Sequence, residues 1–265
     1  MRHVFQKSIR EHLRVVGAWT AASAILAGFY LSLYPSIGGV EEMSQLLEAM
    51  PPPIRAMFAA EGMDLSTPAG YLNLELFGFI LPLLVAAVTV TLGSGATAGE
   101  EERGSLDLLL SCPVPRWRVI LAKAGAAFVL GGVLVAGVWV GLAVTALVCG
   151  IDVALDRVAA ALGSVWLLGL VLGGVALVVG ALSGSRMLSI GVALGIAVVG
   201  FFVNALAPLV ESLRPWQALS PHYHYLAGDP LTNGLDPGHA LTLAAASVVL
   251  AALATVVFQR RDLRA

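Results

Sequence analysis

The chain has 265 residues, of which 58% are hydrophobic and only 12% are charged. An average soluble domain has roughly 25% charged residues, so this composition excludes a soluble enzyme, a secreted disulfide scaffold and a disordered chain. The formal net charge of −2 gives no overall basic field, and we expect no nucleic-acid partner. We predict an all-α polytopic membrane protein that forms a single transmembrane domain over residues 1–265.

Six apolar stretches are long enough to cross the hydrocarbon layer, which takes about 20 residues of helix. They are Val15–Tyr34, Tyr71–Ala98, Val119–Cys149, Val158–Ser183, Leu188–Ala207 and Ala240–Gln259. With six spans both termini lie on one side, and that side receives all of the 15 lysines and arginines except Arg55, Arg157 and Arg214. Positive residues stay in the cytoplasm, so we expect a multi-pass protein of the cytoplasmic membrane with both termini inside.

The segments between and before the spans have predicted structure of their own. Residues 1–14 place Phe5, Ile9 and Leu13 at helical spacing, which predicts an amphipathic helix lying in the inner interface. The outer loops 35–70 and 208–239 are expected to contain short helices, because apolar periodicity and prolines alternate in them. Pro82 lies inside the second span and predicts a kink that frees the carbonyl group of Gly78.

The inner loop 99–118 is the most charged inner stretch between two spans. Its acidic start suits a helix N-terminus, and a leucine face follows, so we predict a short helix over Glu100–Leu110 that lies across the membrane surface and binds a cytosolic partner. The candidate partner-binding residues are Glu100, Glu101, Glu102, Arg103, Gly104, Leu106, Asp107, Leu109, Leu110 and Arg116.

The chain has no energy source of its own. A phosphate-binding loop needs G-x-x-x-x-G-K-[ST], and the two lysines, Lys7 and Lys123, do not lie in such a motif. The six spans also have almost no charge in their interior, whereas ion-coupled carriers place ionisable groups near the midplane. Uphill transport by this chain would therefore depend on a partner.

The inner loop carries a recognisable pattern. Glu102-Arg103-Gly104-Ser105-Leu106, then Leu108–Leu110, Pro113-Val114-Pro115-Arg116 and Lys123 resemble the membrane subunit of exporter-type ABC transporters, as do the outer segments Leu219–Tyr225 and Gly228–Leu231. The resemblance covers nearly the whole chain. It implies a six-span permease without enzymatic activity or cofactor of its own. It also implies two copies of an ABC ATPase subunit that bind ATP and Mg, a second permease copy or a sister permease, and a coupling helix at Glu100–Leu110 that docks on the ATPase.

Two other functions stay open at this stage. His222 and His224 are two residues apart in the last outer loop, and a membrane-embedded metalloenzyme would use them as zinc or copper ligands. A non-transporting assembly factor is compatible with the same composition. For a transporter, the lack of charged groups in the spans favours an amphipathic, lipid-like or drug-like cargo, whereas the residues of the substrate path cannot be named from the sequence.

Overall fold

The computed structural model describes residues 2–36, 51, 67–104 and 115–261, and within these ranges every regular element is a helix. The long helices are α1 (Arg2–Leu33), α5 (Ile80–Ala96), α8 (Arg116–Cys149), α9 (Leu155–Ser183), α10 (Arg186–Leu206) and α14 (Pro237–Arg260). The short ones are η1 (Tyr34–Ser36), α4 (Pro68–Leu72), η2 (Asn73–Phe77), α6 (Ala98–Glu102), η3 (Glu211–Leu213), α11 (Arg214–Gln217), α12 (Pro221–Leu226) and α13 (Pro230–Asn233).

The predicted all-α polytopic membrane fold is confirmed. Five helices of the described chain are each long and apolar enough to span a membrane, and the bent pair Pro68–Phe77 and Ile80–Ala96 gives a sixth. A helix satisfies its backbone hydrogen bonds internally, which is the condition for crossing a hydrocarbon layer that contains no water. The predicted spans therefore correspond to the observed helices in chain order.

The second span is broken close to where Pro82 predicts a kink. The five residues of η2 form a π-helix, two residues of turn follow, and α5 starts at Ile80 with an axis bent by 42°. Pro82 has no N–H group for the carbonyl of Gly78 four residues earlier, so an unbroken helix could not be fully hydrogen-bonded at this point.

The helix predicted at residues 1–14 is not a separate element in the structure. These residues, from Arg2 on, are the first part of α1, a single uninterrupted helix of 32 residues. Such a helix is roughly 48 Å long at 1.5 Å per residue, against a hydrocarbon thickness of about 30 Å. Its polar first turns therefore extend beyond the hydrocarbon layer as a continuation of the span.

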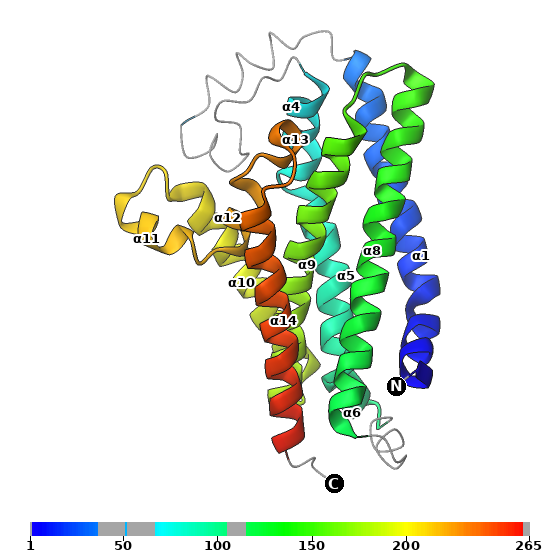
Figure 1. Cartoon of the computed structure of the whole chain (residues 1–265), viewed down its shortest axis with the longest axis vertical. Helices are drawn as coiled ribbons and strands as arrows, with labels where there is room; N and C mark the ends of the chain where they lie inside the picture. Colours follow the sequence, from blue (N-terminus) through cyan, green and yellow to red (C-terminus); the bar gives the residue numbers. More distant parts are fainter. Residues whose placement is uncertain (1, 37–50, 52–66, 105–114, 262–265) are drawn as a thin grey trace.

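The spans surround α9, which packs against α5, α8, α10 and α14 (Figure 1). α1 lies at one side of the bundle and packs mainly on α8, while α10 and α14 lie at the other side and are the least buried spans. Both ends of the chain and α6 lie at one end of the bundle, which we call the terminal end. The short helices α4 and α13 lie at the opposite end, which we call the distal end.

Candidate coupling site at the terminal end

The short helix α6 carries three consecutive glutamates at the terminal end of the bundle. Successive residues of an α-helix are about 100° apart around its axis, so Glu100, Glu101 and Glu102 point in three directions. The structure places each of them against a different helix. One turn of helix thereby joins the end of the second span to three other spans.

Glu100 forms a buried ion pair with Lys123 of α8. Both residues are less than 10% exposed, and the Lys123 ammonium group also donates to the carbonyl oxygen of Ala96 at 2.6 Å. Lys123 thus holds both the last turn of α5 and the start of α6 against α8. The expectation that the spans are nearly free of interior charge misses this lysine, which lies within α8.

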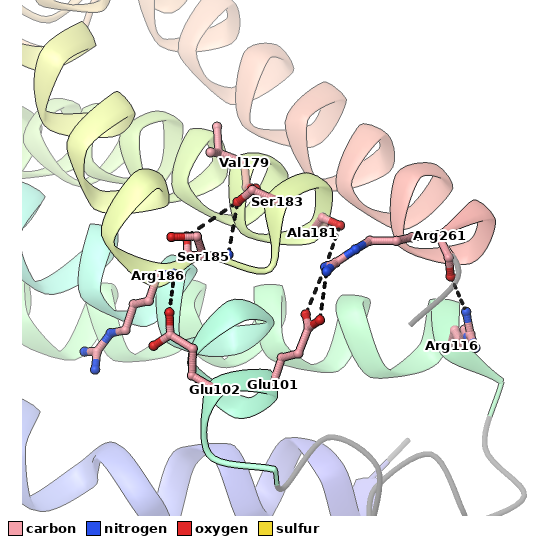
Figure 2. A network of polar contacts seen from close by, with 9 residues as sticks. All are labelled: Glu101, Glu102, Arg116, Val179, Ala181, Ser183, Ser185, Arg186 and Arg261. Carbon is pink, nitrogen blue, oxygen red and sulfur yellow. Dashed lines mark hydrogen bonds and ion pairs between the residues drawn. The ribbon is translucent and has the colours of Figure 1, made fainter. Parts of the chain in front are cut away.

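Glu101 forms a bidentate salt bridge with Arg261, the residue that follows α14 (Figure 2). The two guanidinium nitrogens of Arg261 donate to the two carboxylate oxygens at 2.9 and 2.7 Å, and one of them donates to the carbonyl of Ala181 at 3.3 Å. Gly184 leaves room for this pair: a Cβ there would overlap the Arg261 side chain, and its φ of +66° suits glycine. Parallel hydrogen bonds between charged groups are about twice as strong as neutral ones.

Glu102 accepts a hydrogen bond of 2.8 Å from the backbone N–H of Arg186 at the first turn of α10 (Figure 2). The hydroxyl of Ser185 caps the same helix by accepting from the N–H of Leu188. A carboxylate at a helix N-terminus satisfies a free N–H group and is stabilised by the helix dipole. Arg116, at the start of α8, adds a link to α14 by donating to the Arg261 carbonyl at 2.8 Å.

The predicted partner-binding residues therefore divide into groups. Glu100, Glu101, Glu102 and Arg116 are bound within the chain, whereas Arg103 is exposed. The helix ends at Glu102, and Gly104 has a φ of +67°, so the predicted helix does not run unbroken from Glu100 to Leu110. The remaining candidates, Leu106, Asp107, Leu109 and Leu110, lie outside the described residues.

The partners Lys123, Arg186 and Arg261 were not among the candidates chosen from the sequence. Lys123 had a detectable signal, because a lysine within an apolar stretch needs a compensating carboxylate. Arg186 and Arg261 had none, since basic residues at the inner ends of spans are expected in any membrane protein.

The two candidate metal ligands in the outer segment do not form a common site. His222 is buried beside α10, where its ring meets Phe201 edge-on, and burial lowers its pKa to about 4. The His224 Nδ1 lies 3.0 Å from Nδ1 of His239 instead. Within the described residues, no three His, Cys, Asp or Glu side chains are grouped to hold a metal ion.

A second set of polar contacts joins the segment 220–233 to the broken second span. The Tyr225 hydroxyl, fully buried, donates to the carbonyl oxygen of Phe77 at 2.7 Å. The Asn73 amide lies 3.5 Å from the carboxylate of Asp229. Both contacts are made by η2, so the π-helical part of the span is attached to the segment between α10 and α14.

Comparison with known families favours one of the functions that the sequence leaves open. A family model described as ABC-2 family transporter protein matches residues 3–263, which is nearly the whole chain. The chain belongs to this family. It is an ABC-2 type permease, a membrane transport subunit of a kind that normally works with a separate ABC ATPase subunit. A search of curated proteins gave no match to the chain. The metalloenzyme and assembly-factor alternatives are not favoured by these findings.

Proposed function

We propose that this permease forms the translocation pathway of an exporter and that α6 passes the movement of an ABC ATPase to the spans. The observation that carries the proposal is the set of three neighbouring glutamates, each bound to a different helix. A displacement of α6 acts at once on α8 through Lys123, on α14 through Arg261 and on α10 through Arg186. Packed helices respond to such a displacement as rigid bodies, which would carry the movement to the distal end.

The complete transporter would contain two ATPase subunits, which bind ATP and Mg, and a second copy of this permease or a sister permease. The terminal end would face the cytoplasm, with the protein in the cytoplasmic membrane. The support for this orientation is the concentration of arginines and lysines in the terminal-end segments and the rule that such residues remain inside. The exposed Arg103, together with residues 105–114, would contact the ATPase.

The cargo of the proposed exporter would be an amphipathic, lipid-like or drug-like molecule. Among the described residues, the charged side chain buried within a span is Lys123, and Glu100 of α6 neutralises it near the terminal end. A small ion or a strongly charged solute would require further polar groups along its path. Transport of a small hydrophilic ion as the sole cargo would contradict this part of the proposal.

The test separates docking on the ATPase from transmission of its movement. Arg103→Ala is expected to reduce the amount of ABC ATPase that co-purifies with the permease. Glu101→Gln is expected to leave this amount unchanged and to lower the ATPase activity that the permease stimulates, because the contact with Arg261 is weakened inside the permease. Arg157→Ala, an exposed arginine at the distal start of α9, is the control and should change neither quantity. Unchanged co-purification and unchanged stimulation in both variants would remove the coupling role of α6.

A further inference from the structure

An apolar cavity of about 340 Å³ lies between α5, α8, α9 and α14. Its wall on α8 contains Leu121, Ala124, Gly125 and Phe128, which share one helix face because they are three or four residues apart. Ala127 and Lys123 also line the cavity, and the charge of Lys123 is compensated by its ion pair with Glu100. This part of α8 belongs to the half of the helix nearer the terminal end. The cavity is therefore at the depth of the membrane leaflet on the terminal side.

The lining of the cavity includes exposed side chains of α8 and α14. One turn nearer the terminal end, the space between α8, α9 and α14 is filled by a buried apolar cluster that includes Ile120, Ala181 and Phe258. The side chains at the flank of the cavity are exposed, with Phe128 at 49% and Val248 of α14 at 69% of their surface. An apolar molecule would thus enter between α8 and α14 from the bilayer.

A positive group lies on the same face of α8, one turn closer to the terminal end. Trp117 and Arg118 precede Leu121 by four and three residues, and the Arg118 guanidinium lies 5.1 Å from the centre of the Trp117 ring. Arg118 is exposed and makes no ion pair with a described residue. Tryptophan and arginine are the residues that anchor proteins at the headgroup level.

The spacing of these groups matches half a bilayer. Arg118 and Phe128 are ten residues apart, which is roughly 15 Å along a helix, and half of a hydrocarbon layer is also about 15 Å. A lipid with its phosphate at Arg118 would place an acyl chain alongside Leu121 and reach the level of Phe128. The distance between Arg118 and the cavity thus matches the distance between the phosphate group and the acyl chain of one phospholipid.

We propose that Arg118 and the cavity between α8 and α14 form a binding site for an anionic phospholipid of the leaflet on the terminal side. One acyl chain occupies the cavity and the phosphate group contacts Arg118. Basic groups at such positions attract anionic headgroups, and the other arginine in the same turn, Arg116, is already engaged with the Arg261 carbonyl. The proposal goes beyond the export function, because this lipid binds whether or not it is itself transported.

The experiment uses the complete chain, purified in detergent and mixed with phosphatidylglycerol or phosphatidylcholine that have the same acyl chains. Native mass spectrometry measures the bound lipid and the oligomeric state together. Wild-type protein is expected to retain more phosphatidylglycerol, and Arg118→Gln to lower the ratio of the two lipids about fivefold, the effect of removing one basic residue near the surface. Arg157→Gln, at the distal end, is the charge control.

A second variant tests the cavity. Ala251→Leu places a larger side chain on the cavity wall and is expected to lower the binding of both lipids. Ala252→Leu, the neighbouring exposed residue outside the wall, should leave binding unchanged. Equal retention of both lipids by the wild type would overturn the proposal, as would equal binding by the two leucine variants. A changed oligomeric mass of Ala251→Leu at an unchanged lipid count would also overturn it and would identify the cavity as a contact between copies of the chain.

Discussion

Replacement of Lys123 by methionine tests whether the buried pair with Glu100 holds the terminal end together. Methionine keeps the length of the side chain and removes its charge, so the Glu100 carboxylate remains in a site where it is only 9% exposed. Removing one partner of a buried pair typically costs about 3–5 kcal/mol, because the other charge is left without compensation. The hydrogen bond to the Ala96 carbonyl at 2.6 Å is lost as well.

The double replacement Lys123→Met with Glu100→Gln removes both charges. A buried neutral amide costs far less than a buried carboxylate that has lost its partner, so the double variant should regain much of the stability that the single variant loses. The chain also offers an exposed reference pair, Lys7 and Glu11, whose charged groups are 3.6 Å apart and half exposed. Lys7→Met should cost less than about 1 kcal/mol.

Thermal unfolding of the purified chain, followed by its helical signal, measures these differences. For a chain of this size a change of 1 kcal/mol shifts the melting temperature by about 2–4 °C. Lys123→Met should therefore lower the melting temperature by about 6–20 °C, and the double variant by much less. The reasoning is refuted if Lys123→Met unfolds at the same temperature as Lys7→Met, or if the double variant is as unstable as Lys123→Met.

Two further predictions concern the segment between α10 and α14. Tyr225→Phe removes the hydroxyl that donates to the Phe77 carbonyl. In the same unfolding assay it should lower the free energy of unfolding by about 1–3 kcal/mol. A loss no larger than that caused by Tyr223→Phe would contradict this prediction. Burial lowers the pKa of His222 to about 4. Between about pH 6.5 and pH 4, His222 is therefore protonated in the unfolded chain and neutral in the folded chain. The free energy of unfolding should therefore fall by up to about 3 kcal/mol between pH 6.5 and pH 4. The same measurement on His222→Gln should show a smaller decrease. If the wild type and His222→Gln have the same pH dependence, the prediction that His222 is buried and neutral is wrong.

The spans could be predicted because the membrane leaves few structural choices. Tyr71–Ala98 is long and apolar enough to cross, and Pro82 within it requires a break, which the structure shows. The sequence did not show that the helix at residues 1–14 continues into the first span. The spacing of Phe5, Ile9 and Leu13 is the same whether the helix lies on the membrane surface or continues the span, so periodicity alone does not fix its direction.

The candidate site was predicted in its location and not in its contacts. The acidic turn before Arg103 is evident from the sequence, and the helical period sets the directions of its three glutamates. Their partners depend on which helices are neighbours, and Glu101 and Arg261 are 160 residues apart. Arg261 and Arg186 also belong to the basic residues that set the orientation of the chain in the membrane. The sequence indicates this role for them and gives no sign of their contacts with α6. The same charges therefore keep the terminal end on one side of the membrane and, once the helices have packed, bind α6 to the bundle.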